Sequence, residues 1–226
     1  MAQLKALIVD YGGVLTAPLG DTMDHWFSTD RIDPDAFRAA MRDWLGLAES
    51  TVERVSPIHA LERGEIDPPE FERQLAARLR TVDGGPVDPV GLLMRMFAGY
   101  GGAIEPPPLL EAVRRVKAAG FATALLSNSW GMDYPRDGWV DLFDVVVISG
   151  EVRMRKPEPE IYQLTLDQLG LAAQECVFVD DLRPNTRAAA ELGMVGVHHT
   201  SDAETLARLE ELFGIALAGA PTESAR

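Results

Sequence analysis

Residues 4–15 read Leu-Lys-Ala-Leu-Ile-Val-Asp-Tyr-Gly-Gly-Val-Leu, an apolar run that ends at Asp10 and breaks into a glycine turn. A run of this length and composition is typical of a buried strand, which we place over residues 4–9. Open α/β sheets bind their ligands beyond the carboxyl ends of the strands. The position of Asp10 therefore predicts an α/β fold with a functional carboxylate at that edge of the sheet.

Four further runs are short, rich in Val and Ile, and bounded by Gly, Asp or Pro. They cover residues 121–126, 145–149, 176–179 and 195–197. Between them lie helical segments that end at Gly120, Gly170 and Gly193, each of which suits a left-handed helix cap. Ser201 and Glu204 have capping-box spacing for a last helix. The alternation of strands and helices predicts a parallel sheet covered by helices on both faces.

The segment between the first and second predicted strands, roughly a hundred residues long, exceeds the usual length of a single crossover. Its apolar residues recur at helical spacing, as Phe37, Met41 and Leu45 do. Asp-Pro pairs that favour helix starts stand at residues 33–34, 67–68 and 88–89. The segment is therefore predicted to be a helical insertion.

The domain boundaries follow from this insertion. We place it at residues 16–104, and the core that it interrupts at residues 1–15 and 105–226. The hinges are expected at residues 16–21 and 101–108, where Gly-Gly and Pro-Pro-Pro are typical of a linker. Residues 218–226 are small and polar, and they are expected to form a frayed tail.

The composition limits the classes of partner. The chain has 226 residues and a net charge of −14, whereas nucleic-acid binding depends on Lys and Arg. We therefore expect no nucleic acid and no membrane as partner, while a small phosphorylated metabolite needs only a local positive site. Cys176 is the only cysteine and is expected in the core. No signal peptide or membrane span is recognisable, so a cytoplasmic protein is expected, and a homodimer stays open.

Three more blocks follow residues 4–15. They are Leu-Leu-Ser-Asn at residues 125–128, Arg-Lys-Pro at residues 155–157 and Val-Phe-Val-Asp-Asp at residues 177–181. Together with Asp10 they resemble the haloacid dehalogenase-like hydrolases, the aspartate-nucleophile phosphatase superfamily. The chain looks most like the subgroup that includes the N-terminal phosphatase domain of soluble epoxide hydrolase and bacterial sugar-phosphate phosphatases. The resemblance implies a Rossmann-like core and identifies the helical insertion as a cap domain that closes over the active site.

This resemblance implies that Asp10 is the nucleophile. An aspartate attacks phosphorus well only if a cation screens both charges, and Mg²⁺ is suited because it prefers oxygen ligands. The resemblance implies that Asp10, the main-chain carbonyl of Gly12 and Asp181 bind the Mg²⁺. It also implies that Asp180 lies behind them, facing Lys156, and that Asn185 supports the site. Taken alone, Asp180 and Asp181 would be interpreted as helix-capping acids of a βα loop.

Ser127, Asn128 and Lys156 complete the predicted site. The hydroxyl of Ser127 and the amide of Asn128 are expected to hold phosphoryl oxygens, although such a pair alone is only a turn signal. Lys156 precedes a proline, which disfavours helix geometry, and its ammonium is expected to reach the nucleophile and the phosphate. The alternative for Lys156 is a solvated lysine in a basic patch with Arg153 and Arg155.

Residue 12 departs from the family pattern, because phosphatases of the family usually have a second aspartate there and this chain has Gly12. We predict a Mg²⁺-dependent phosphomonoester hydrolase that acts through a phospho-Asp10 intermediate. It lacks an acid/base worth about 10² to 10⁴ in rate unless an acid such as Asp21 or Asp24 replaces it. One alternative is a haloacid dehalogenase, because a halide leaves without a proton. The other is a phosphometabolite-binding protein that has lost turnover.

The sequence leaves some neighbours of the site undecided. Five aromatic residues are candidates for pointing into it: Trp26, Trp44, Tyr100, Trp130 and Tyr134. His198 and His199, which end the last predicted strand, are interpreted as a surface or strand-edge pair.

Overall fold

The computed structural model describes residues 3–16, 19–45, 56–98, 108–131 and 133–217. Within these residues one sheet has the order β3-β2-β1-β4-β5, and every neighbouring pair of strands is parallel. The predicted parallel sheet is therefore confirmed, with the first strand at its centre. The strands are β1 (Ala6–Val9), β2 (Ala122–Ser127), β3 (Val145–Ile148), β4 (Cys176–Asp180) and β5 (Val195–His198).

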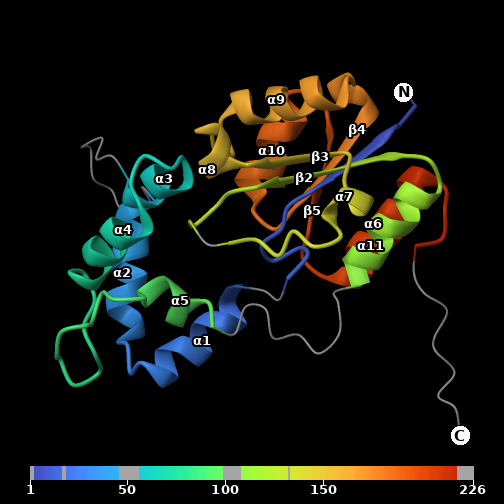
Figure 1. Ribbon diagram of the computed structural model, residues 1–226. Coiled ribbons are helices and arrows are strands. Elements are labelled where there is room, and N and C mark those ends of the chain that lie inside the picture. Colours follow the sequence, from blue (N-terminus) through green and yellow to red (C-terminus); the bar gives the residue numbers. More distant parts are fainter. Residues whose placement is uncertain (1–2, 17–18, 46–55, 99–107, 132, 218–226) are drawn as a thin grey trace, which may run out of the picture.

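Alternate residues of β1 contribute to two cores, one on each face of the sheet. Leu7 and Val9 belong to the core that includes α6 and α11, whereas Ala6 and Ile8 belong to the core that includes α9 and α10. Figure 1 shows the two helix pairs on opposite sides of the sheet. Burial on both faces explains why the strand is apolar without alternation. The helices are α6 (Pro108–Ala118), α9 (Pro159–Leu169), α10 (Arg183–Glu191) and α11 (Asp202–Phe213).

Several predicted helix ends are confirmed. α9 ends at Gly170, whose φ of 67° is left-handed, and the side chain of Ser201 caps α11 by accepting the N–H of Glu204. α10 begins earlier than the predicted residue 186, because Pro184 suits a first helical turn. Two short helices were not predicted, since they are too short to show a period: α7 (Trp139–Leu142) and α8 (Ser149–Val152).

The insertion between β1 and β2 is helical, as predicted, and has a hydrophobic core of its own. Trp26, Phe71 and Leu75 lie at its centre with exposed fractions of 1% or less. Asp33 and Asp67 cap α2 and α4, as their Asp-Pro pairs predict. The insertion comprises α1 (Leu19–Thr29), α2 (Pro34–Trp44), α3 (Pro57–Glu62), α4 (Pro68–Ala76) and α5 (Leu92–Met96).

The helix start predicted at residues 88–89 is wrong. α5 begins only at Leu92, after Gly91, whose φ of 64° is left-handed. Asp88 Oδ1 accepts the N–H of Val90 at 2.9 Å and closes a turn that precedes the helix. Asp caps turns and helices through the same kind of hydrogen bond, so the residue pair could not distinguish them.

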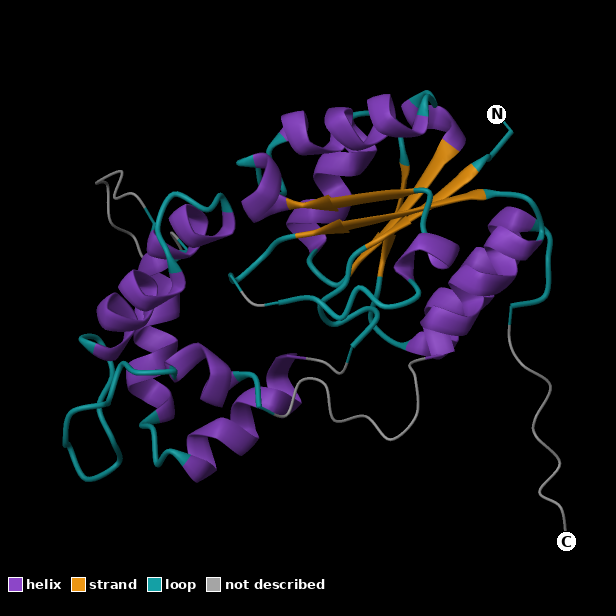
Figure 2. Cartoon of the chain, viewed as in Figure 1, coloured by secondary structure: helices purple, strands orange, loops and turns teal. Residues whose placement is uncertain are grey.

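The predicted boundaries fall mostly outside the described residues. Residues 17–18, 101–107 and the tail 218–226 are not described, so the division at residues 15–16 and 104–105 stays a prediction. Figure 2 shows strands in the core and helices in the insertion. Among the described residues, no helix combines the length and the apolar character needed to cross a bilayer.

Candidate active site

Asp10 directly follows β1 and is 7% exposed. Its main-chain N–H donates to the carbonyl of Val179 at 2.9 Å, which ties it to β4. Its Oδ1 accepts the N–H of Tyr11 at 2.7 Å and lies 2.8 Å from Nζ of Lys156. These contacts hold Oδ1 of Asp10 in place. Oδ2 is therefore the carboxylate oxygen that is better placed to react.

Lys156 is 1% exposed and has an acceptor for each of its three ammonium hydrogens. Nζ donates to the carbonyl of Leu126 at 2.9 Å and to Asp180 Oδ2 at 2.6 Å, and pairs with Asp10. Burial alone would lower the pKa of Lys156, but Asp10 and Asp180 outweigh it and raise this pKa above its ordinary value. The alternative of a solvated surface lysine is therefore wrong.

Asp180 and Asp181 have different surroundings. Both oxygens of Asp180 are occupied, since Oδ1 accepts the N–H of Leu182 at 2.8 Å and Asn185 Nδ2 donates to both oxygens at 2.9 and 3.1 Å. Asp180 thus holds Lys156, and Asn185 supports Asp180, in the arrangement that the resemblance implied. Asp181 is half-buried and faces the cavity described below, so it is better placed than Asp180 to bind a metal ion.

Carboxylate oxygens of Asp10, Asp180 and Asp181 lie within 4.8 Å of one another. Burial, together with the charge of Asp180, raises the pKa of Asp10 to about 7 and the pKa of Asp181 to about 6, although Lys156 opposes both shifts. One ammonium thus faces three carboxylates. An all-oxygen donor set with excess negative charge fits a hard divalent cation such as Mg²⁺, which Asp10, Asp181 and the main-chain carbonyl of Gly12 would hold.

Ser127 and Asn128 follow one another at the end of β2 but have different contacts. Ser127 Oγ lies 3.0 Å from the hydroxyl of Tyr134, whose pKa burial raises to about 12. Asn128 Nδ2 donates to the carbonyl of Lys156 at 3.0 Å, and its Oδ1 accepts the N–H of Lys156 at 2.9 Å. Asn128 therefore orients Lys156, a role that the sequence did not indicate, and its contact to a substrate stays a prediction.

Gly12 and Gly13 differ in their need for glycine. Gly13 has a φ of 70°, and a Cβ there would lie 2.5 Å from Oδ2 of Asp181. Gly12 is not among the glycines with positive φ. A side chain at residue 12 would therefore carry no left-handed backbone strain.

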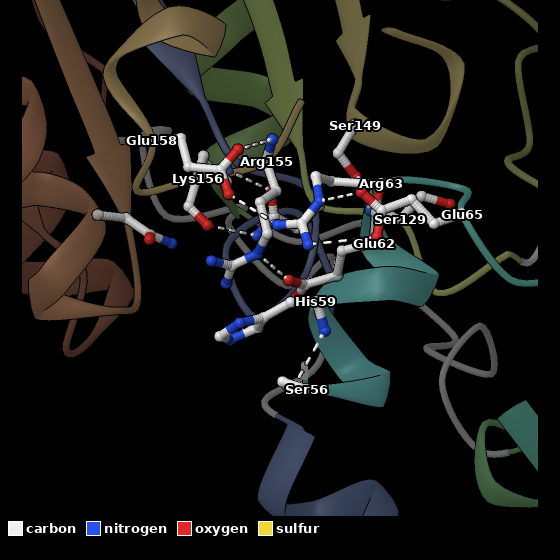
Figure 3. A network of polar contacts seen from close by, with 12 residues as sticks. Ser56, His59, Glu62, Arg63, Glu65, Ser129, Ser149, Arg155, Lys156 and Glu158 are labelled. Atoms are coloured by element: carbon white, nitrogen blue, oxygen red, sulfur yellow. Dashed lines mark hydrogen bonds and ion pairs between the residues drawn. The ribbon is translucent and has the colours of Figure 1, made fainter. Parts of the chain in front are cut away.

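Two ion pairs and a hydrogen bond join the end of α3 and the residue that follows it to the core beside Lys156 (Figure 3). Arg155 Nε lies 2.5 Å from Glu62 Oε2, and an Nη of Arg63 lies 2.8 Å from Glu158 Oε1. Ser149 Oγ donates to the carbonyl of Glu62 at 2.5 Å. Since Arg155 and Glu158 flank Lys156 in the sequence, these contacts hold the insertion against the same segment that carries the lysine.

A cavity of about 480 Å³ extends from the carboxyl edge of the sheet into the insertion. We call Asp10, Ser127, Lys156 and Asp181 its nucleophile end. Its cap end is lined by Met23, Phe37, Met41, Leu45, Ile58, Met96, Phe97 and Trp130.

The cavity decides between the aromatic candidates. Trp130 and Tyr134 line it. Trp26 and Trp44 are 1% and 7% exposed, belong to the hydrophobic core of the insertion, and do not line the cavity. Tyr100 lies outside the described residues.

The replacement acid expected at Asp21 or Asp24 is not supported. Asp24 is exposed and does not line the cavity, and the side chain of Asp21 lies outside the described part of the chain. Among the described residues that line the cavity, apart from those that define the nucleophile end, the side chains that can carry a proton to donate are the carboxyls of Glu62 and Asp133 and the phenols of Tyr11 and Tyr134.

His198 is a residue of the site that sequence reasoning missed. It ends β5, and its Nε2 lies 3.0 Å from the main-chain oxygen of Asp181, so it holds the loop after β4. His199 instead contacts Thr205 at the start of α11, with 2.9 Å between Nδ1 and Oγ1. Both residues are half-buried, and His198 ends the edge strand β5, so the strand-edge interpretation fits and full surface exposure does not. The available signal was the position of His198 at the carboxyl end of a strand, which it shares with Asp10.

The comparisons with known proteins agree with this geometry. The family model described as haloacid dehalogenase-like hydrolase matches residues 4–193. The sesquiterpene phosphatase astK of Aspergillus oryzae is 30% identical over 218 residues, which are 93% of this chain and 97% of that protein. Bifunctional epoxide hydrolase 2 of Rattus norvegicus is 35% identical over 122 residues, 50% of this chain and 22% of that protein.

The solved structures share the fold. A HAD family enzyme from Bacteroides thetaiotaomicron, crystallised with magnesium and inorganic phosphate, superposes with a TM-score of 0.57 at 21% identity. The match covers 88% of this chain and 96% of that one. The predicted Rossmann-like core with an inserted cap is confirmed by this likeness.

Proposed function

The chain belongs to the haloacid dehalogenase-like hydrolases, and we propose that it is a Mg²⁺-dependent phosphomonoesterase of small organic phosphates. The observation that carries this proposal is the nucleophile end of the cavity, where Asp10, Lys156 and Asp181 converge. The epoxide hydrolase similarity agrees with the subgroup expected from the sequence. The name of the Aspergillus relative, a sesquiterpene phosphatase, supports phosphate ester substrates.

The reaction has two steps at Asp10. Oδ2 attacks phosphorus while the bond from phosphorus to the ester oxygen breaks, and the departing oxygen keeps the electron pair and takes up a proton. Water then attacks the phosphorus of phospho-Asp10 and gives up one proton to the solvent, the Oδ2–phosphorus bond breaks with its electron pair staying on Oδ2, and inorganic phosphate leaves. A bound Mg²⁺ would supply charge neutralisation at the phosphoryl oxygens. Lys156, whose raised pKa keeps it protonated, contributes a fixed positive charge beside the nucleophile.

The site lacks an acid at residue 12 that could protonate the departing oxygen. Gly12 has no side chain to donate this proton, so esters of acidic alcohols, such as aryl phosphates, should react faster than alkyl phosphates. Loss of a positioned acid costs about 10² to 10⁴ in rate. Turnover is therefore expected to be slow with alkyl esters but not absent.

The proposal is tested by phosphate release from an aryl phosphate with Mg²⁺ and with a chelator. Acid quenching during turnover, followed by mass spectrometry of the peptides, should place a phosphoryl group on Asp10. Release that is unaffected by the chelator would contradict the metal requirement. A phosphoryl group on any other residue would contradict the nucleophile.

Gly12 also favours one alternative, a haloacid dehalogenase, because a halide needs no proton. The cluster of Asp10, Asp180 and Asp181 opposes it, since dehalogenation has no phosphate charge for a divalent cation to screen. Release of halide from a short 2-haloacid, without phosphate release from any ester, would support the dehalogenase. Saturable binding of a phosphate ester without any product would support a binding protein that has lost turnover.

A further inference from the structure

The cap end of the cavity offers a bound molecule few polar contacts. Its described side chains are aliphatic, thioether or aromatic, and Trp130 has the one N–H among them. All but Trp130 come from the insertion, on α1, α2, α3 and α5 or directly after α2 and α5, and Trp130 comes from the core loop that follows β2. An organic group attached to a phosphate at the nucleophile end would therefore extend into the cap end. We call this apolar cap end the chamber.

Two charged side chains also line the cavity beyond the nucleophile end, and both lie outside the set of cap-end residues. Glu62 is 6% exposed, and its carboxylate is paired with Arg155 at 2.5 Å. Asp133 is exposed and lies in the loop between β2 and α7. The hydroxyls of a sugar would thus lose water at the cap end without gaining partners there.

The aromatic side chains of the chamber are held by other rings. Trp130 lies edge-on to Phe71 and to Phe97, with centroid distances of 5.8 and 5.7 Å. Phe37 lies edge-on to Trp26 at 5.6 Å. Met23, Met41 and Met96 also line the cap end, and methionine adapts to differently shaped apolar groups. The chamber is therefore suited to apolar groups of more than one shape.

We propose that the substrates are monophosphate esters of apolar alcohols, with linear or branched hydrocarbon chains, rather than sugar phosphates. This inference rests on the proposed function. The volume of the whole cavity, about 480 Å³, lies within the range of small-molecule sites. Each methylene group that the chamber buries should raise kcat/KM about threefold to fourfold. A hydroxyl placed there should lower it about tenfold.

The test is a series of substrates that share the phosphate and differ in the alcohol. kcat/KM would be measured for butyl, octyl and decyl phosphate, farnesyl monophosphate and a hexose phosphate, all below the concentrations at which micelles form. We expect a rise on the order of 100-fold from butyl to octyl phosphate, and hexose phosphate below both. A flat series, or hexose phosphate as the best substrate, would overturn the inference.

A matched pair of variants places the effect in the chamber. Met41 lines the cap end, whereas Met94 on α5 is 76% exposed and does not line the cavity. Met41→Gln should lower the octyl-to-butyl ratio of kcat/KM about fivefold or more, and Met94→Gln should leave this ratio unchanged. Leu45→Gln, at a position that is 44% exposed, is the substitute if Met41→Gln does not fold, and it should lower the same octyl-to-butyl ratio. Equal ratios in all variants would contradict the proposed chamber.

An aryl phosphate separates the failure of this inference from failure of the proposed function. Turnover of the aryl ester with a flat alkyl series would retain the phosphatase and reject the apolar alcohol. Without turnover of any ester, calorimetry with butyl, octyl and decyl phosphonate decides. Affinity that rises with chain length supports the apolar chamber, and affinity that does not rise overturns it.

Discussion

The two ends of the cavity are built from different kinds of contact. At the nucleophile end, Lys156 Nζ has three acceptors within 2.9 Å, and Asp180 receives hydrogen bonds at both oxygens. At the cap end, the lining side chains pack without such directional contacts. Displacing one hydrogen-bonded group at the first end disturbs its partners, whereas a thioether or an aliphatic chain can change rotamer. The reaction and the choice of alcohol should therefore be separable by mutation.

The largest effect is expected from Asp10→Asn. An amide neither attacks phosphorus nor neutralises Mg²⁺, so phosphate release should fall on the order of 10⁴-fold or more, equally for all alcohols. Phosphate release across the alkyl series measures this, and the melting temperature shows whether the variant folds. A loss that depends on the alcohol would break the separation between the two ends.

Lys156→Met should reduce both activity and stability. Removing the ammonium leaves Asp180 buried without its cation, which typically costs about 3 to 5 kcal/mol, and the rate should fall about 10² to 10³-fold. Chemical denaturation and kcat measure the two losses. Lys117→Met is the control, because the pair of Lys117 with Asp144 is partly exposed and such pairs contribute about 1 kcal/mol or less. A stability loss equal to that of the control would mean that Lys156 is not needed to compensate Asp180.

The two ligand assignments at the end of β4 can be ranked by Mg²⁺ affinity. Asp181→Ala removes a carboxylate that we place on the metal ion, whereas Asn185→Ala only loosens Asp180. Loss of a supporting residue typically weakens metal binding about 10 to 100-fold, and Asp181→Ala should exceed that. Calorimetric titration of each variant with Mg²⁺ gives the order. A larger effect from Asp180→Ala than from Asp181→Ala would exchange the roles of the two aspartates.

The pH dependence of stability should differ with and without Mg²⁺. Asp10 and Asp181 have folded pKa values of about 7 and about 6, above the unfolded value of about 3.9. As pH rises from about 4 to about 7, the unfolded chain holds fewer protons at these groups than the folded one, so their contribution to stability falls. Mg²⁺ should therefore raise the Tm at about pH 8 and have little effect at about pH 5. An equal Tm increase at both values would contradict the assignment of these carboxylates.

The sequence predicted the nucleophile end better than the cap end. Asp10, Ser127 and Asp180 lie at the carboxyl ends of parallel strands, so the positions of the strands in the sequence predict that these residues meet at one edge of the sheet. The lining of the cap end depends on which face of each short helix turns inward, and the sequence does not show this. Trp44 and Trp130 were equal candidates by residue type, but only Trp130 lines the cavity. The role of Asn128 was hidden for a different reason. Its partners are main-chain atoms of Lys156, distant in sequence, and no side-chain pattern reports them.

The backbone conformation of the glycine turn at residues 12–13 also could not be predicted from the sequence. The sequence could not say which glycine of the pair has a left-handed φ. Gly13 is the one with a φ of 70°, so residue 12 accepts a side chain without that strain. This difference makes Gly12 the position at which the missing acid can be introduced.

The smallest effect, a gain, is expected from Gly12→Asp. A carboxylic acid near the departing oxygen should raise kcat for alkyl phosphates toward the lower end of the range for acid catalysis, about 10²-fold. Aryl phosphates should gain less, because their alcohols leave without full protonation. The gain should be equal for butyl and octyl phosphate, since the cap end is untouched. Gly12→Asn, of similar size but without an acidic proton, is the control, and should show no gain. A folded Gly12→Asp variant without any gain on alkyl esters would mean that another group lining the cavity already donates the proton, or that departure of the alcohol is not the slow step. The described candidates for such a donor are Glu62, Asp133, Tyr11 and Tyr134.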